Sequence, residues 1–333
     1  MRMRTCWTAI ILSGVAGHVR PAMAQVDQER AQAFFKEAQA LCDRDGGRLW
    51  GVSLCAPMVI GDMRTQSFAT SQPPPDAPRP PVVGLVNGPV QWGGATWPAY
   101  AWDDLVNRTA QSRNEVLLHE LFHGVQPRLG LVVPDPKNEH LDALDGRYWL
   151  QLEWRALARA LRTSGEQRHA AVRDALTFRQ ARRRIYPAAA ENERALEMNE
   201  GTASYAGTAL AASSRAHATA SALDILRGFE KGESFLRTFA YASGPAYGLL
   251  LDEASPGWQR ALRSSDDLGV LLMKAPAVQP ADDRAGAAAA YGGVELRAAE
   301  RQREQLRAER LNELRLRFGD GPVLVIPGGG GGY

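Results

Sequence analysis

The stretch RNEVLLHELFHGVQP, residues 113–127, decides how this chain is expected to fold. It holds two of the six histidines in 333 residues, set four positions apart among leucine, valine and phenylalanine. Residues four apart lie on one face of an α-helix, one turn above each other. The apolar spacing predicts a helix over 111–126 whose apolar face is buried in the core.

The pentapeptide His119-Glu120-Leu121-Phe122-His123 matches the pattern H-E-x-x-H. On a helix, both imidazoles can reach one ion while the glutamate lies beside it. Neutral imidazole suits zinc, and a carboxylate next to a zinc-bound water can accept its proton. Without an ion or partner, this group would leave uncompensated charge inside the protein. We therefore predict a Zn²⁺ site at His119 and His123, with Glu120 as general base.

A catalytic zinc needs a third protein ligand and an open position for water. The metzincin pattern requires Gly at 126 and His at 129, where this chain has Gln126 and Leu129, so that class is excluded. Downstream, MNEGTASYAG at 198–207 offers Glu200 on a predicted helix, followed by small residues that allow two helices to approach closely. The other candidates for this ligand are Glu197, one turn before Glu200 on a similar face, and His140, Asp142 and Asp145 in the segment NEHLDALDGRYW.

HELFH and NEGTASY together resemble the zinc site of gluzincin metallopeptidases, in particular the NEGFASY-type segment of the membrane-alanyl and leukotriene-hydrolase aminopeptidases. The resemblance covers these two short motifs. It implies a zincin-like catalytic region with His119, His123 and Glu200 as ligands and Glu120 as general base. The 77 positions between His123 and Glu200 exceed the usual gluzincin connection, so the helices between them must fold back to bring the motifs together.

Two departures from the family pattern change what the resemblance implies. The Gly-x-Met-Glu-Asn element that holds a free N-terminus in those aminopeptidases is absent, so aminopeptidase specificity is not implied. Four positions after the third ligand, where thermolysin-like members have an aspartate that supports a ligand histidine, this chain has Ser204. We expect the partners of the ligand histidines to come from elsewhere.

A tyrosine is the expected donor to the oxyanion. Hydrolysis builds negative charge on the attacked carbonyl oxygen, and gluzincins meet it with Tyr or His. The segment RTFAYASGPAYGLLLDE, 237–253, carries Tyr241 and Tyr247 and resembles the Tyr-x-x-Gly segment that follows the zinc ligands in some peptidases of this clan. Tyr241 is the first candidate, with Tyr247 and Tyr205 as alternatives.

The whole chain predicts an α+β fold: a small, mostly antiparallel sheet followed by a predominantly helical, zincin-like catalytic region. Residues 27–43 have helical spacing, and β-forming runs over 45–104 predict the sheet, with a hairpin at Asn87-Gly88. The run RQARRR at 179–184 is typical of a solvated helix face. Further helices are predicted at 139–164, 166–184, 188–213, 216–229, 233–252, 255–263 and 294–318.

We divide the chain into four parts. Residues 1–24 have the basic start, apolar run and small-residue site of an export signal. Residues 25–110 hold the first helix and the sheet, and 111–275 form the helical zinc-binding region. Residues 276–333 comprise a linker, the charged helix, a short strand at 323–327 and a Gly-rich tail.

Charge and cysteines bear on partners and location. A net charge of +2 provides no strong field for nucleic acid, and the apolar run in 1–24 is too short to remain in a membrane, so no stable insertion is expected after the signal is removed. The mature protein should be periplasmic or secreted. Cys42 and Cys55 are expected to form a disulfide in that oxidising compartment.

The sequence therefore predicts an exported zinc metallohydrolase, a gluzincin-like peptidase acting on a peptide or protein substrate. The alternative is a zinc-binding envelope protein without catalytic activity, serving as a scaffold or peptide-binding module. The glutamate inside the H-E-x-x-H pattern favours the enzyme, because a purely structural zinc site does not need a carboxylate there.

Overall fold

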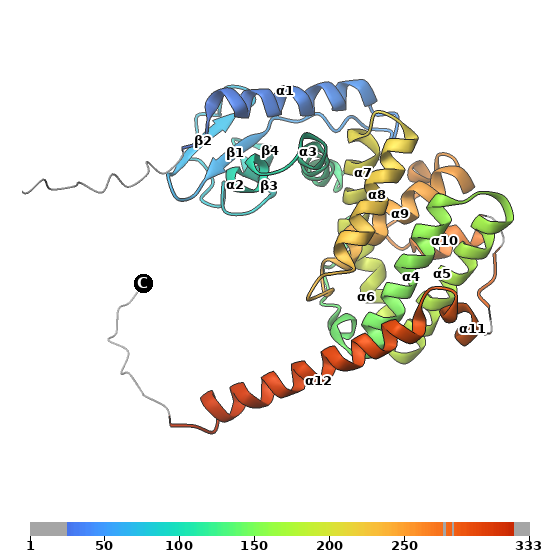
Figure 1. Cartoon of the computed structure of the whole chain (residues 1–333). Coiled ribbons are helices and arrows are strands. Elements are labelled where there is room, and N and C mark those ends of the chain that lie inside the picture. Colours follow the sequence, from blue (N-terminus) through green and yellow to red (C-terminus); the bar gives the residue numbers. More distant parts are fainter. Residues whose placement is uncertain (1–24, 276–277, 282, 323–333) are drawn as a thin grey trace, which may run out of the picture.

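The computed structural model describes residues 25–275, 278–281 and 283–322. This part of the chain is predominantly helical and contains one four-stranded sheet near its N-terminus (Figure 1), which confirms the predicted α+β fold. The export signal predicted at 1–24 and the strand predicted at 323–327 lie outside the described residues. No helix in the described ranges has both the length and the apolar character needed to cross a membrane.

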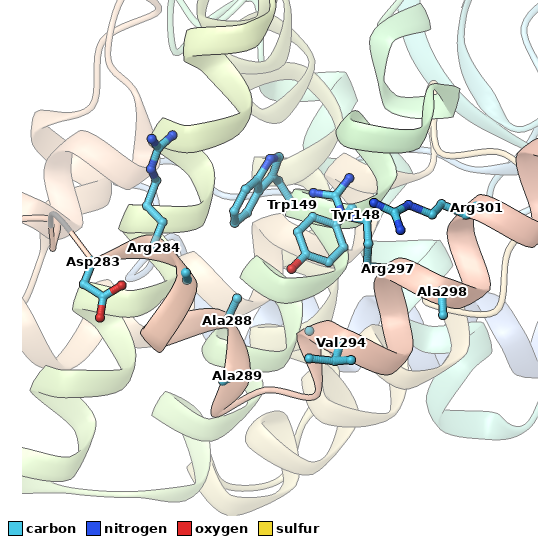
Figure 2. Close-up of a pocket in the computed structure, with 12 residues that line it drawn as sticks. Tyr148, Trp149, Asp283, Arg284, Ala288, Ala289, Val294, Arg297, Ala298 and Arg301 are labelled. Carbon is cyan, nitrogen blue, oxygen red and sulfur yellow. The ribbon is translucent and has the colours of Figure 1, made fainter.

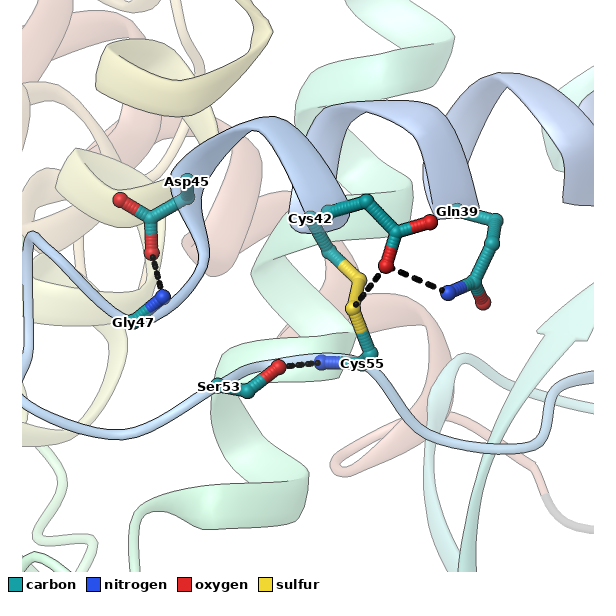
Figure 3. The surroundings of a disulfide bond; sticks show 7 residues. Gln39, Cys42, Asp45, Gly47, Ser53 and Cys55 are labelled. Atoms are coloured by element: carbon teal, nitrogen blue, oxygen red, sulfur yellow. Dashed lines mark hydrogen bonds between the residues drawn. A yellow bond between two sulfur atoms is a disulfide. The ribbon is translucent and has the colours of Figure 1, made fainter.

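Helix α1 (Gln28–Asp45) confirms the helix predicted over 27–43. Asp27 caps its first turn by accepting a hydrogen bond from the Arg30 amide, and Gly46, with φ of 55°, ends it in the left-handed conformation that suits glycine. Its apolar side packs against the sheet and α3 (Ala110–Val125). A disulfide joins Cys42 in its last turns to Cys55 in the following loop (Figure 3), as predicted.

The sheet has the strand order β2–β1–β4–β3. Strand β1 pairs antiparallel with β2 and parallel with β4, and β3 pairs antiparallel with β4, so two of the three pairings are antiparallel. The order leaves β3 and β2 at the two edges of the sheet, within the described residues. The strands are β1 (Val59–Asp62), β2 (Ser67–Thr70), β3 (Gly88–Trp92) and β4 (Ala95–Ala101).

The hairpin predicted at Asn87-Gly88 is wrong. The hairpin turns instead at Gly93 and Gly94, whose φ angles of 57° and 78° match the two-residue turn that joins β3 to β4. The Asn87 side chain has another role: its Oδ1 accepts from the Ala101 amide and its Nδ2 donates to Asp104. The β-forming run before it, 82–86, forms only an isolated bridge, and 48–54 forms a turn and loop.

Helix α3 packs against both the sheet and α7 (Thr202–Ala211), so it lies between the sheet and the helical region (Figure 1). Helices α4 (Leu144–Arg162) and α5 (Gly165–Ile185) form a hairpin inside the long connection between the two motifs, which folds back as expected. The remaining helices are α2 (Trp102–Val106), α6 (Ala189–Leu196), α8 (Arg215–Phe229), α9 (Phe239–Ala254), α10 (Leu268–Lys274), α11 (Arg284–Ala289) and α12 (Gly293–Phe318), with 3-10 turns at Glu139–Asp142 and Trp258–Ala261.

The helix predicted over 188–213 is interrupted. A π-helical turn, Glu197–Gly201, separates α6 from α7 and carries Glu200. Gly201 in this turn touches Gly244 of α9. A Cβ atom at position 244 would collide with the backbone of Gly201. Gly207 of α7 meets the α3 backbone in the same way. The small residues after Glu200 thus permit the close helix approach that the sequence predicts.

The run RQARRR at 179–184 is not the solvated face that was predicted. Arg182 is fully buried, with its Nε 2.6 Å from Glu193 Oε1 and its Nη1 2.6 Å from Glu153 Oε2. Arg179, also buried, donates from Nη1 to Glu197 Oε1 at 2.9 Å. The prediction fails because α4 and α6 bring carboxylates against this side of α5, and buried charges persist when they are paired.

The end of the chain adds two helices that were not predicted. Helix α11 lies within the predicted linker, where the Ala-rich run forms a short helix capped by Asp283, and α10 begins at the capping residue Asp267. Figure 2 shows the cavity of about 820 Å³ that α11 and the first turns of α12 form with Tyr148 and Trp149 of α4. None of the predicted zinc-site residues lines this cavity.

Candidate metal centre

Three predicted ligand atoms converge in the structure. His119 and His123 lie one turn apart on α3, with their Nε2 atoms 3.0 Å apart. Glu200 Oε2, from the π-helical turn, lies 3.3 Å from His119 Nε2 and 3.4 Å from His123 Nε2. The site thus joins residues 77 positions apart, because α7 packs alongside α3.

The triangle of these three atoms has the size that a divalent cation requires. Its centre lies about 1.9 Å from each atom, close to the zinc–nitrogen and zinc–oxygen bond lengths of about 2.0–2.1 Å, so these three residues would be able to hold such an ion. His119 and Glu200 are 8% and 7% exposed, and the polar neighbours of Glu200 Oε2 are the two histidine nitrogens. The other carboxylate oxygen, Oε1, lies 3.3 Å from Arg237 Nη2, which leaves Oε2 to the histidine pair.

The protonation of the triangle also agrees with its use as a cation site. Burial alone would raise the pKa of Glu200, but hydrogen bonds from both histidines hold it well below the usual value, so the carboxylate is ionised at neutral pH. Burial acts against the charged form of His123, yet the Glu200 carboxylate raises its pKa. A cation in the triangle would replace the protons that the histidines otherwise share with Glu200.

Each histidine has a polar partner behind it. His123 Nδ1 is 2.8 Å from Gln126 Oε1, and His119 Nδ1 is 3.2 Å from Ser204 Oγ. These contacts orient the rings so that both Nε2 atoms face Glu200. The expectation that support would come from somewhere other than position 204 is wrong for His119, since the Ser204 hydroxyl itself reaches the ring. Gln126, which was not among the predicted site residues, lies three positions after His123, a spacing at which helical side chains meet.

Glu120 lies beside the triangle without joining it. Its Oε1 is 4.0 Å from His119 Nε2, and its Oε2 is buried without a hydrogen-bond partner among the described residues. Burial raises the pKa of the Glu120 carboxyl, the two histidines lower it, and Glu200 raises it further. The carboxylate is therefore placed to exchange a proton with a molecule bound at the triangle.

Of the three candidate tyrosines, only Tyr241 faces the site. Its ring stacks on His119 with centroids 5.4 Å apart and planes 11° apart. Burial and the nearby Glu200 carboxylate raise the pKa of Tyr241, so its hydroxyl keeps its proton. The hydroxyls of Tyr205 and Tyr247 donate elsewhere, to Asp252 at 2.7 Å and to Glu153 at 2.6 Å.

The alternative third ligands lie away from the histidine pair and have other partners. Glu197 binds Arg179, and His140 Nε2 is 2.8 Å from Glu193 Oε1. Asp142 accepts hydrogen bonds from the Ser234 hydroxyl and the Phe235 amide. Asp145 pairs with Arg297. The only other group of potential ligand atoms in the described residues, Cys42, Asp43 and Cys55, contains the disulfide and offers no thiolate.

A cavity of about 370 Å³ opens beside the triangle. His119, Glu120 and Tyr241 line it, so a molecule in the cavity can reach both the ligand triangle and the carboxylate beside it. Catalytic metal sites need such an opening, whereas structural ones are closed by a fourth protein ligand. No family model, curated protein or solved structure matches the chain.

Proposed function

We propose that this protein is an exported zinc metallohydrolase, a peptidase of the gluzincin kind. The observation that carries the proposal is the triangle of His119, His123 and Glu200, open to a cavity and flanked by the buried carboxylate of Glu120. Two imidazoles and one carboxylate are the ligand set of one group of catalytic zinc sites. A bound zinc ion supplies Lewis acidity, which acidifies water and polarises a carbonyl group.

The residues around the triangle have distinct roles in the proposed reaction. Glu120 accepts the proton of the attacking water and then passes it to the leaving amine, which a carboxyl with a pKa raised by burial does well near neutral pH. Tyr241 donates its hydroxyl proton in a hydrogen bond to the developing oxyanion. Gln126 and Ser204 contact the Nδ1 atoms of His123 and His119 and so fix the orientation of the two rings.

The edge of the sheet supports a peptide as the substrate. Strand β3 pairs only with β4 in the described part of the chain, so its other edge can pair with an extended segment. Asn87, the residue before β3, lines the cavity that opens at the triangle. A peptide added along β3 by main-chain hydrogen bonds would therefore run toward the ligand triangle.

Export is part of the proposal. The Cys42–Cys55 disulfide supports it, because structural disulfides persist in oxidising compartments such as the periplasm and the extracellular space. The substrate is then a peptide or protein outside the cytoplasm, and the sequence features at 1–24 provide the export signal.

A single substitution, Glu120→Gln, separates the peptidase from the non-catalytic alternative. The variant keeps the shape of the side chain and all three ligands, so it should bind zinc like the wild type but cut no member of a peptide library. Glu166→Gln, an exposed position in the first turn of α5, is the matched control and should keep full activity. A wild-type protein that binds zinc and cuts no peptide would support the scaffold, and one that binds no zinc would refute both.

The third ligand has its own test. Glu200→Ala removes the only carboxylate of the triangle and should release zinc to a chelator far more readily than the wild type. Glu166→Ala is the control, measured by the same metal analysis after dialysis. Equal zinc retention by the two variants would remove Glu200 from the proposed site.

A further inference from the structure

The cavity beside the ligand triangle contains a carboxylate that the proposed reaction does not use. Glu115 lies on α3 four residues, or about 6 Å along the helix axis, before His119, and it lines the cavity. The carboxylate is partly buried between α3 and α8. It belongs to neither the triangle nor the group that supports it.

The charge of Glu115 has no cationic partner in the described residues. Its Oε1 accepts hydrogen bonds from the Gln111 amide, at 2.7 Å, and from the Ser221 hydroxyl. Both donors are neutral and both bind the same oxygen, which leaves Oε2 available to a molecule in the cavity. A partly buried carboxylate with only neutral donors attracts a cation more strongly than a solvated one does.

The arginine on the cavity wall, Arg108, does not offset the charge of Glu115. Arg108 is bound by Asp104, with Nη2 2.6 Å from Oδ1, and also donates from Nη1 to Ser112 Oγ at 3.1 Å. Asn87 donates to the second oxygen of the same aspartate at 2.7 Å. The guanidinium is therefore neutralised locally, and the cavity keeps the negative charge of Glu115.

Three apolar side chains line the same cavity, next to the hydroxyls of Ser204 and Thr208. Val116 lies on the α3 side, and Ile225 and Phe229 of α8 lie opposite. The stem of a long basic side chain packs well on such a surface while its charged head reaches a polar group beyond it. The four-carbon stem of lysine spans roughly one helical turn, the separation between His119 and Glu115.

We propose that this cavity is a specificity pocket for a basic side chain, lysine or arginine, next to the bond that is cut. The inference rests on the proposed peptidase function and deepens it by naming the substrate class. Glu115 binds the cationic head, Val116, Ile225 and Phe229 hold the stem, and the peptide carbonyl then lies at the ligand triangle.

Binding can be measured without turnover by using the zinc-loaded Glu120→Gln variant. The probes are otherwise all-alanine hexapeptides with Lys, Arg, norleucine or Glu at one position, titrated calorimetrically. The Lys and Arg peptides should bind about tenfold tighter than the norleucine peptide, the size expected for one charge-assisted hydrogen bond. Adding Glu115→Gln, which keeps the side chain's shape, should remove that preference, and Glu115→Lys should transfer it to the Glu peptide.

Asp224→Asn is the matched control. It removes one carboxylate from α8, next to Ile225, but Asp224 faces solvent and pairs with Arg227. Its preference for Lys over norleucine should equal that of the parent variant. Equal binding of the Lys and norleucine peptides, binding of none of them, or an unchanged preference after Glu115→Gln would overturn the pocket.

Cleavage of the same peptides by otherwise wild-type enzyme distinguishes this inference from the proposed function. The ratio of kcat/KM for Lys over norleucine should fall about tenfold in Glu115→Gln. Mass spectrometry should map the cut beside the basic residue. If the wild type cuts nothing while binding still favours Lys through Glu115, the peptidase proposal fails and the pocket stands. If the wild type cuts the Lys and norleucine peptides with equal kcat/KM, the peptidase proposal stands and the pocket fails.

Discussion

Gln126 provides a sharp test of the metal centre, because it does not contact the ion position but holds one of its ligands. Its Oε1 lies 2.8 Å from His123 Nδ1, and its Nε2 donates to the Leu131 carbonyl at 3.2 Å. The side chain is 4% exposed, so water does not replace it readily. The perturbation is Gln126→Leu, which has nearly the same volume and no hydrogen-bonding group.

The structure implies two separate effects of this substitution. Losing the partner that orients a ligand histidine typically lowers metal affinity about 10–100-fold. Leaving a buried imidazole nitrogen and a carbonyl without partners should also lower the free energy of unfolding by about 1–3 kcal/mol. Gln151→Leu isolates the second effect, because Gln151 is also 4% exposed and donates to Arg147 O and Glu300 Oε1, away from the triangle.

The assay is a zinc titration against a chromophoric chelator, combined with urea denaturation of the metal-free proteins. Gln126→Leu should lose both zinc affinity and stability, whereas Gln151→Leu should lose stability alone. The reasoning is refuted if Gln126→Leu binds zinc as tightly as the wild type, or if the two variants lose zinc affinity equally.

Three further outcomes are expected. Tyr241→Phe should retain zinc and lower kcat by about 10²–10³-fold in the peptide assay, because it loses one donor to the oxyanion; wild-type kcat would contradict its role. Replacing Cys42 and Cys55 together by serine should lower the free energy of unfolding in urea by about 3 kcal/mol, and no change would count against a structural disulfide. Burial alone would raise the pKa of Glu193, but the arginines of α5 hold it well below its usual value, so its stabilisation is present above about pH 5 and is lost as the pH falls. The drop in Tm from pH 6 to pH 3 should therefore be smaller in Glu193→Gln, and an equal drop would show that this carboxylate is not linked to folding.

Local patterns predict the elements of this fold well where one segment decides its own conformation. The helix predicted over 27–43 appears as α1, and that over 111–126 appears as α3. Both have side-chain caps at their first turns, from Asp27 and Thr109, and an apolar stripe that faces the core. Capping and stripe spacing are short-range properties, so they can be predicted without knowing what the helix packs against.

The predictions that failed depend on partners distant in sequence. Asn87-Gly88 is favourable for a tight turn, but the Asn87 side chain bonds the Ala101 backbone and Asp104, and the chain turns later. The arginine run at 179–184 has the composition of a solvated face, yet three carboxylates from other helices neutralise it inside the protein. Neither outcome could be inferred from the residues on either side.

In the candidate site too, some residues could be predicted from a local pattern and one depends on contacts between distant segments. The sequence alone placed His119 and His123 on one face, because the α-helix repeat brings residues four apart together, and it placed Glu120 beside them. Only the tertiary structure brings Glu200 within 3.4 Å of both rings, since this requires the α4–α5 hairpin to fold back and small residues to let α7 approach α3. Helical spacing follows from backbone hydrogen bonds within one segment, whereas the meeting of two helices depends on the packing of side chains far apart in the chain.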